Sequence, residues 1–391
     1  MEHYIFYCKL SLLAVLSLIT ACCMLSRRWY VNLAAFLACL SGETFLAHLF
    51  FPGYMLCPAA ASFIILFLSR IWDLSRTSAK GNGADPIRLP VRSGIRESRL
   101  EFHYHYSNFL VYGGAGSGKT KSIGKWLLSE YMRLGFAGFI YDFKDTDYTR
   151  TAYNLIKRHR YPHKFYYVSF DRPERSYRFN PLKVVRDRTE LIQLMEDVLL
   201  ALLPKKEQQN EWVAGGLGIL RGVAFRFWDE FPEHCTLPHI LAFIMTASAR
   251  QLSLFLQQNL VSEMLAGAYL KAEGSEKTQA SYLSTLCNNL ATISQNEEIA
   301  YVLSGDDFDF NLIDPENPKL FAVSNNFSKN SVYAPVISML MTISARQFSM
   351  QNRVPFVYFL DEMTTVNIKN FETLPSVLRE YKAAFILLTQ S

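Results

Sequence analysis

The chain has 391 residues, enough for more than one domain, and half of them are hydrophobic, a high share for a soluble protein. Its seven cysteines form no C-x-x-C pair and lie mostly in the apolar N-terminal region, which argues against a zinc site or a disulfide framework and suits a reducing compartment. The net charge of +5 arises in the first hundred residues, because acidic and basic residues balance after that point. A global basic footprint for nucleic acid is therefore excluded, and any DNA contact would need a local lining.

Residues 1–72 form the apolar part of the chain. Three apolar stretches with almost no charge lie at 4–25, 30–51 and 54–68; Arg27-Arg28 separates the first two, Pro52-Gly53 separates the last two, and the second contains Glu43. The first is long enough to span a bilayer, and the flanking arginines belong on the cytoplasmic side. We expect three transmembrane helices with an outside N-terminus, or two if Glu43 excludes the middle segment. A cleaved signal over the first stretch is the remaining alternative.

Residues 73–100 differ in composition from the segments on both sides. Ser, Gly, Pro and Arg are frequent and apolar periodicity is weak, which predicts a juxtamembrane linker. Its arginines could contact anionic lipid, although topology and solvation are the simpler interpretation. A cytosolic domain would then begin at residue 101.

A glycine-rich motif at residues 113–120 fits G-x-x-x-x-G-K-[ST] without a mismatch. It follows a short β-favouring stretch, Asn108–Tyr112, and precedes a helical pattern that Gly135 closes. Strand, loop and helix in this order surround phosphate oxygens with backbone N–H groups and a helix N-terminus. We therefore predict nucleoside triphosphate binding. The contact residues would be Gly113, Gly114, Ala115, Gly116, Ser117, Gly118, Lys119 and Thr120.

Two side chains of this motif have specific predicted roles. Lys119 would reach the β- and γ-phosphates of ATP, and the Thr120 hydroxyl would ligate Mg²⁺. The helix after the loop is predicted from an apolar pattern at helical spacing. The residues of this pattern are Ile123, Trp126, Leu127, Tyr131 and Leu134.

The first part of the nucleotide-binding domain, residues 101–188, contains two further predicted strands, Phe136–Tyr141 and Tyr166–Phe170. The first runs into Asp142. Because ligands gather at the carboxyl ends of parallel strands, Asp142 is predicted to face the nucleotide. An ion pair with Lys144 is the alternative.

Residues 189–299 lose the strand signals. Apolar residues recur there at helical spacing and the breaks are short polar loops, which predicts an all-α insertion into the sheet. Residues 300–391 return to the α/β pattern, with predicted strands Lys319–Ser324 and Ala383–Leu388 and a helix at Ala334–Phe348. The predicted fold class is therefore α/β with a parallel sheet.

A second catalytic element follows the predicted strand Phe356–Leu360. Asp361 and Glu362 come directly after this apolar run. Behind a phosphate-binding loop, such a pair is predicted to act in hydrolysis: Asp361 would hold Mg²⁺ through water, and Glu362 would polarise the attacking water.

Several short sequence features, spread over nearly the whole chain, together match the pattern of one protein family. They are the N-terminal spans, Gly113–Thr120, Tyr141-Asp142-Phe143-Lys144, Asn180-Pro181-Leu182, the helical insertion, Asp307-Phe308-Asp309-Phe310, Leu360-Asp361-Glu362 and Gln390-Ser391. In this order and spacing they resemble the type IV coupling proteins, the TraG/TraD-type ATPases of bacterial conjugation and type IV secretion.

The resemblance implies a RecA-like P-loop NTPase domain with an inserted all-α subdomain, preceded by transmembrane helices. It implies a hexameric ring, multi-pass in the bacterial inner membrane, with the ATPase domain in the cytoplasm. In that family the ring moves a relaxase–DNA complex, or effector proteins, toward the type IV secretion channel. It also implies that Gln390 senses the nucleotide state and that Arg379 reaches the phosphate of the neighbouring subunit. A solvated helix charge is the alternative for Arg379.

Two features depart from the family pattern. Asp142 is followed by Phe-Lys-Asp where the family has Pro-Lys-Gly, and family members continue beyond the Gln-Ser at 390–391. A sheet ending there would leave the strand Ala383–Leu388, or a neighbour of it, with an uncovered edge. For the 391-residue chain we therefore expect weak ATP binding, poor hydrolysis and few closed rings.

Two other functions stay open on the sequence. An FtsK-like DNA translocase shares the phosphate-binding loop. A non-hydrolysing receptor would bind nucleotide and dock partners. Turnover with and without single-stranded DNA separates these from a coupling ATPase.

Overall fold

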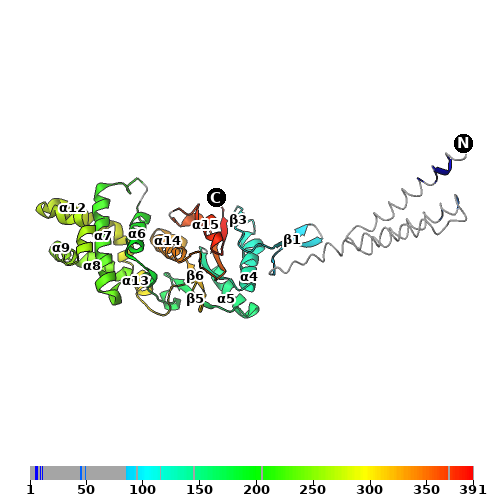
Figure 1. Cartoon of the computed structure of the whole chain (residues 1–391), viewed down its shortest axis with the longest axis horizontal. Helices are drawn as coiled ribbons and strands as arrows, with labels where there is room; N and C mark the ends of the chain where they lie inside the picture. The colour runs from blue at the N-terminus through cyan, green and yellow to red at the C-terminus, as the bar shows by residue number, and fades with distance from the viewer. Residues whose placement is uncertain are drawn as a thin grey trace. The chain divides into compact units, whose positions relative to one another are not determined.

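The computed structural model describes residues 85–391, apart from residues 94, 95, 115, 144, 145, 204, 205, 369 and 391, together with residues 5–7, 9, 11, 45 and 49. Asp85–Ser391 is one compact unit and is described by itself (Figure 1). The predicted transmembrane segments and the first part of the predicted linker lie outside the described residues. Within the described part of the chain, no helix has the length and apolar character needed to cross a membrane.

The core of this unit is a parallel sheet. Its strands pair in the order β3-β8-β7-β4-β6-β5, and every pairing is parallel. This agrees with the predicted α/β class. The strands are β3 (Phe109–Tyr112), β4 (Ala137–Asp142), β5 (Lys164–Ser169), β6 (Lys319–Ser324), β7 (Phe356–Leu360) and β8 (Ala383–Thr389).

The central strands are apolar throughout because both faces of the sheet are covered. In β7, Phe356, Tyr358 and Leu360 belong to one core cluster, whereas Val357 and Phe359 belong to the other. One face packs on α4 (Lys125–Arg133) and α5 (Asp147–His159). The opposite face packs on α14 (Asn330–Arg346).

The sequence predicted an uncovered sheet edge at the strand 383–388 or at one of its neighbours. The strand at 383–389, β8, is interior, flanked by β3 and β7. Among the described strands, the edge lies one strand further out, at β3, where Leu110 is 69% and Tyr112 is 70% exposed. The carboxyl end of β8 is thereby placed beside the loop that follows β3.

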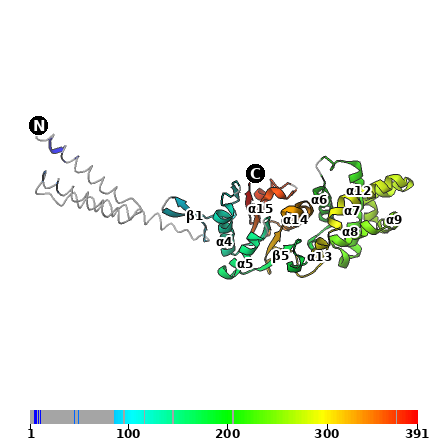
Figure 2. The same cartoon turned by 180° about the vertical axis from the view of Figure 1, so that it is seen from behind.

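Helices fill the chain between β5 and β6. Figures 1 and 2 show them as a cluster on one side of the sheet, with α14 between the cluster and the strands. Among the described residues of this segment there is no strand. The helices are α6 (Arg188–Ala201), α7 (Glu211–Glu230), α8 (Leu237–Thr246), α9 (Ala249–Gln257), α10 (Leu260–Leu265), α11 (Gly267–Lys271), α12 (Glu276–Ser294) and α13 (Glu297–Leu303).

The chain enters and leaves this helical cluster at one place. Asp307 N–H donates to Arg178 O at 2.8 Å, and Arg178 N–H donates back to the Asp307 carboxylate at 2.8 Å. Beside this pair, Phe179 and Phe308 stack with ring centroids 4.8 Å apart. Two motifs of the family resemblance, the ones at 180–182 and 307–310, therefore lie where the helical cluster joins the sheet.

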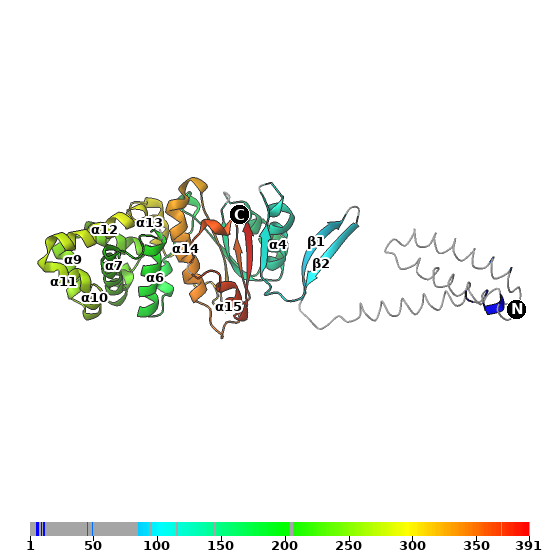
Figure 3. The ribbon, with the colours of Figure 1, turned by 90° about the horizontal axis from the view of Figure 1, so that it is seen from above.

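Part of the segment predicted as linker is ordered. Ile87–Ser93 (β1) and Arg96–Phe102 (β2) form an antiparallel hairpin, which Figure 3 shows beside α4. Ile87 is buried in the α4 core cluster, and Arg88 N–H donates to the Glu130 carboxylate at 2.8 Å. The linker interpretation is therefore wrong for residues 87–100. In β1 the apolar residues Ile87, Leu89 and Val91 alternate with polar or proline positions over only seven residues, which is too short a run for a periodicity argument.

Candidate functional site

Three predicted site residues meet at the carboxyl edge of the sheet. Lys119 follows β3, Glu362 follows β7 and Gln390 follows β8. Lys119 Nζ donates to Thr389 O at 2.6 Å and lies 3.8 Å from Glu362 Oε1. Because β3, β8 and β7 are adjacent, residues far apart in sequence share one small region.

Glu362 is held in a constrained arrangement. Its φ of +48° is in the left-handed region, which non-glycine residues seldom adopt and which recurs at functional sites. The Gln390 backbone N–H donates to Glu362 Oε2 at 3.2 Å, and Gln390 Nε2 donates to Oε1 at 2.5 Å. The carboxylate thus contacts both the Lys119 ammonium and the Gln390 amide.

The glycine loop has the backbone that phosphate binding requires. Gly116 and Gly118 have φ values of +74° and +83°, where a side chain would strain the loop. A Cβ at Gly113 would lie 2.8 Å from Ser117 Oγ. Gly114 and Ser117 complete the described loop, and Ala115 lies outside the described residues. The prediction that these residues contact phosphate stays a prediction.

The helix after the loop begins with a wide π-helical turn, η2 (Thr120–Gly124), before α4. Leu127 and Tyr131 are buried as the apolar pattern predicts, but Ile123 and Trp126 are exposed. The predicted helix is therefore present, and only part of its apolar pattern is buried. A π turn advances fewer degrees per residue than an α turn, so the face shifts along the sequence.

A residue missed by sequence reasoning packs against this turn. Tyr148 of α5 is buried, and a Cβ at Gly124 would lie 2.4 Å from its hydroxyl oxygen. Burial raises the pKa of Tyr148, and the nearby carboxylates of Asp361 and Asp142 raise it further. Tyr148 therefore supports the helix that carries Thr120. A tyrosine at helical spacing gives no sequence signal for this role.

Asp142 anchors the start of α5. It is fully buried, and one carboxylate oxygen accepts the Thr149 N–H at 2.8 Å. Its other oxygen has no hydrogen-bond partner among the described residues. Burial raises the pKa of Asp142 to about 6, against the hydrogen bonds from Thr149. The alternative partner Lys144 lies outside the described residues, and a contact with nucleotide stays a prediction.

Oxygen ligands suited to Mg²⁺ lie at the same edge. Thr120 begins η2, half-buried, and Asp361 is buried next to β7, with its N–H donated to Tyr141 O at 3.0 Å. A hydroxyl and a carboxylate are the donor types that Mg²⁺ takes from proteins when phosphates and water supply the rest. The side chains present therefore fit the ion.

Arg379 lies apart from this group. It is exposed near the end of α15 (Leu374–Glu380), and its carbonyl accepts the Lys382 N–H just before β8 begins. It is thus at the amino end of β8, whereas Gln390 follows the carboxyl end. Within one chain, the structure does not bring Arg379 to Lys119 and Glu362.

Residues 90–391 match the family described as type IV secretory system conjugative DNA transfer. The chain belongs to this family. The family assignment confirms the resemblance to type IV coupling proteins drawn from the sequence. No curated protein matches the chain in sequence.

Solved structures of a conjugative coupling protein have a similar fold. The bacterial conjugative coupling protein TrwBdeltaN70 is 16% identical, with a TM-score of 0.58 over 82% of this chain and 69% of that chain. TrwB in complex with ADP and Mg²⁺ is 16% identical, with a TM-score of 0.58 over 79% and 74%. TrwB with the ATP analogue ADPNP is 17% identical, with a TM-score of 0.57 over 80% and 73%. At this identity the likeness concerns the fold.

Proposed function

We propose that the chain is an ATPase of a type IV secretion or conjugation system, in which ATP hydrolysis drives DNA transfer. The observation that carries the proposal is the meeting of Lys119, Glu362 and Gln390 behind a glycine loop with two left-handed glycines. The bound ADP, ADPNP and Mg²⁺ of the TrwB structures support ATP and Mg²⁺ as the ligands here.

Lys119 is bound to Thr389 O and lies close to Glu362. Incoming phosphates would compete for the Lys119 ammonium, because an anionic oxygen is a stronger acceptor than a carbonyl. Lys119 would then leave Glu362 free to polarise a water molecule for attack on the γ-phosphate. Gln390, bound to the Glu362 carboxylate, would register this change and carry it to β8.

Mg²⁺ would be held by the Thr120 hydroxyl and, through water, by Asp361. When bound, it would neutralise charge on the phosphate oxygens. The phosphates themselves would lie against the N–H groups of residues 113–119 and the first turn of η2.

Membrane attachment is part of the proposal and rests on the apolar residues 1–72. The chain would be a multi-pass protein of the bacterial inner membrane with residues 101–391 in the cytoplasm, divided as 101–188, the insertion 189–299, and 300–391. A reporter fused after Arg99 should then report a cytoplasmic position, and a periplasmic signal would reject this topology.

The family supports the proposed partners. They are a relaxase–DNA complex or effector proteins as cargo, components of the secretion channel, and further copies of the chain in a hexamer. The exposed Arg379 fits a finger directed at a neighbouring subunit.

Replacement of Lys119 tests the ATPase proposal. Lys119→Ala removes the phosphate-directed charge and should lower ATP hydrolysis at least about 100-fold, as expected for loss of one electrostatic stabiliser of a transition state. The matched control is Lys121→Ala, which removes an exposed lysine of η2 two positions later. The measurement is phosphate release by the purified 391-residue chain. Equal rates for wild type and Lys119→Ala would reject the proposal, whereas nucleotide binding without any turnover in the wild type would favour a docking receptor.

A further inference from the structure

A groove lies along the sheet edge opposite the glycine loop. The edge strand there is β5, since β3 ends the other side of the described sheet. Two adjoining cavities, of about 600 and 750 Å³, share Thr146, Tyr167 and Arg172 and so form one depression. We call it the Arg172 groove. Its inner cavity, of about 600 Å³, is lined by Phe143, Asn325 and Phe327, and its outer cavity, of about 750 Å³, by Arg150, Tyr153, Arg175 and Tyr177.

The Arg172 groove is locally basic, although residues 101–391 are neutral overall. Arg150 comes from α5, and Arg172 and Arg175 come from the turn after β5. Among the described lining residues the one carboxylate is Asp171, whose oxygen pairs with Lys329 Nζ at 3.0 Å. The hydrogen bond from Lys329 lowers the pKa of Asp171, so the carboxylate is ionised and its negative charge is offset by the Lys329 ammonium.

Arg175 keeps its guanidinium available. Its ion pair with Glu174 is 3.9 Å long, and the two side chains are 71% and 66% exposed. Exposed pairs of this kind contribute little and exchange readily for a better anion. A phosphate can accept two parallel N–H bonds from a guanidinium, which a distant carboxylate does not.

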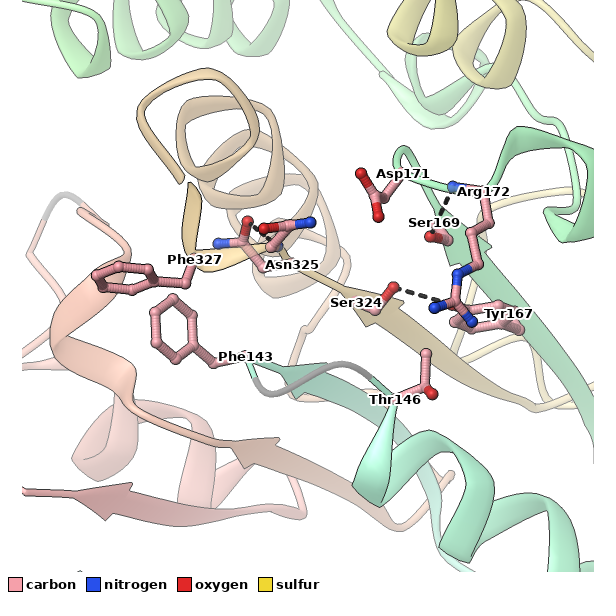
Figure 4. Close-up of a pocket in the computed structure, with 10 residues that line it drawn as sticks. Phe143, Thr146, Tyr167, Ser169, Asp171, Arg172, Ser324, Asn325 and Phe327 are labelled. Atoms are coloured by element: carbon pink, nitrogen blue, oxygen red, sulfur yellow. Dashed lines mark hydrogen bonds between the residues drawn. The ribbon is translucent and has the colours of Figure 1, made fainter. Parts of the chain in front are cut away.

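Aromatic rings are interleaved with these arginines. Tyr153 is 59% and Tyr177 is 44% exposed, so both rings reach solvent. Figure 4 shows Tyr167 and Arg172 at one end of the inner cavity and Phe143 with Phe327 at the other. The Phe143 and Phe327 rings contact edge to face at 6.3 Å, and Phe327 is 82% exposed.

We propose that the Arg172 groove binds single-stranded DNA, with bases stacked on the tyrosine and phenylalanine rings and phosphates paired with the arginines. The proposal deepens the proposed function by assigning a site to the DNA cargo. Exposed rings alternating with guanidinium groups are the composition of surfaces that bind single strands without sequence preference. A duplex keeps its base faces stacked internally, so it would use the arginines and leave the rings unused.

A chain of hydrogen bonds joins the groove to the nucleotide edge. Asn325, which lines the inner cavity, donates to the Tyr141 hydroxyl at 2.9 Å. The Tyr141 and Thr365 hydroxyls are 2.7 Å apart, and Thr365 Oγ1 donates to Glu362 O at 2.7 Å. Three hydrogen bonds therefore connect the wall of the groove to Glu362. We expect DNA bound in the groove to change the rate of ATP hydrolysis through them.

The first test measures how much the arginines contribute to DNA binding. Binding of a fluorescent oligothymidylate of about 16 nucleotides to the 391-residue chain, without added ATP, is followed by anisotropy at several salt concentrations. In the Arg150→Ala/Arg175→Ala double variant, the slope of log affinity against log salt should become shallower by about 0.7 for each arginine. Arg250→Ala, which removes an exposed arginine of α9 outside the groove, should bind like wild type. An unchanged slope in the double variant overturns the proposal.

The second test measures the rings. Tyr153→Ala should weaken binding about fivefold or more, whereas Tyr153→Phe, which keeps the ring, should not. An abasic oligomer of the same length should bind more weakly than the oligothymidylate. Equal binding of the abasic oligomer would show that the bases contribute nothing, which overturns the proposal. Displacement of the DNA by polyglutamate at the same concentration of negative charge would do the same and would make the groove a site for an acidic peptide.

Hydrolysis separates this proposal from the ATPase proposal. ATP hydrolysis without DNA should be the same in the groove variants and in wild type, while stimulation by oligothymidylate should be lost in the double variant. A wild-type chain without turnover would reject the ATPase proposal and leave the binding tests of the groove intact. Stimulation that survives in the double variant would count against the groove.

Discussion

At the scale of one residue, Glu362 contacts the other predicted catalytic side chains directly. Its carboxylate lies 3.8 Å from Lys119 Nζ and accepts two hydrogen bonds from Gln390. Each of these contacts uses a group that hydrolysis would need elsewhere. The left-handed backbone of Glu362 is maintained because Thr365 binds its carbonyl from both its N–H and its hydroxyl.

The contact between Glu362 and Lys119 leads to a prediction about binding as well as chemistry. Glu362→Gln should reduce ATP hydrolysis by about 100-fold or more, because the amide cannot act as a base. It should also tighten binding of a non-hydrolysable ATP analogue several-fold, because the neutral side chain no longer attracts Lys119 or repels phosphate. Titration calorimetry measures the second effect. Weaker binding in the variant would mean that Glu362 positions Lys119 for the nucleotide.

Asp142 predicts a pH dependence of stability. Its folded pKa of about 6 lies above the ordinary value near 4, so the folded state retains a proton that the unfolded state has lost. The contribution of Asp142 is therefore most favourable below pH 4, declines between about pH 4 and 6, and stays low above pH 6, a difference of order 3 kcal/mol. In Asp142→Asn this decline should be absent. Thermal midpoints of both chains from pH 4 to 7.5 measure it, and a constant difference between them would show that Asp142 is ionised throughout.

At the scale of elements, α7 organises the helical cluster through close backbone contacts. A Cβ on Gly222 would lie 2.8 Å from Leu256 Cδ2 and 2.9 Å from Ser262 O, and Ser262 Oγ donates to Gly222 O at 2.6 Å. The glycine lets α10 approach α7 closely enough for this bond, which no larger residue would permit.

Gly222→Ala should therefore destabilise the helical cluster by about 1–3 kcal/mol, the usual effect of overpacking. Gly267→Ala is the matched control. A Cβ there meets nothing within 4 Å, so the same substitution should leave stability unchanged or raise it slightly. Chemical denaturation of both variants provides the measurement. A neutral Gly222→Ala would show that α10 can shift away at little cost.

The sequence predicts best those elements whose residue pattern follows from a single physical requirement, such as burial on both faces. Strands such as Lys319–Ser324 and Phe356–Leu360 are buried on both faces, so an apolar run marks them to the residue. The β1–β2 hairpin was missed because charged residues alternate with its few apolar ones. The helix after the glycine loop was predicted, but the π turn at its start changes the helical phase and leaves part of its apolar pattern exposed. Lys119 and Glu362 were predicted from motifs that follow recognisable strands and Gln390 from the family resemblance, and the structure brings the three side chains together.

The Arg172 groove illustrates the limit of such reasoning. Its residues come from α5, from β5 and from the turn after β5, and no spacing along the chain links them. The neutral charge of residues 101–391 indicated that a nucleic-acid contact must be local, but only the packing of α5 against the sheet edge shows where the arginines gather. The coupling of Tyr141 to Asn325 and Thr365 likewise depends on strand order.

At the scale of the whole molecule, the position of Arg379 is informative. Lys119 and Glu362 form one site within a chain, whereas Arg379 lies at the other end of β8, exposed. If Arg379 serves in catalysis, it must reach the nucleotide of another copy. The active site would then be shared between subunits of the proposed ring.

A mixing experiment decides whether the site is shared. Arg379→Ala and Lys119→Ala should each lose most ATP hydrolysis. When the two variants are co-assembled, some interfaces join an intact Lys119 from one subunit with an intact Arg379 from the next, so part of the activity should return. Lys119→Ala mixed with Glu362→Gln is the control: both residues belong to the same site within one chain, 3.8 Å apart, and mixing should restore nothing. Phosphate release measured across mixing ratios gives the result. Full activity of Arg379→Ala alone would show that Arg379 is a solvated helix charge, and an inactive mixture of the first pair would show that the catalytic residues do not cross between subunits.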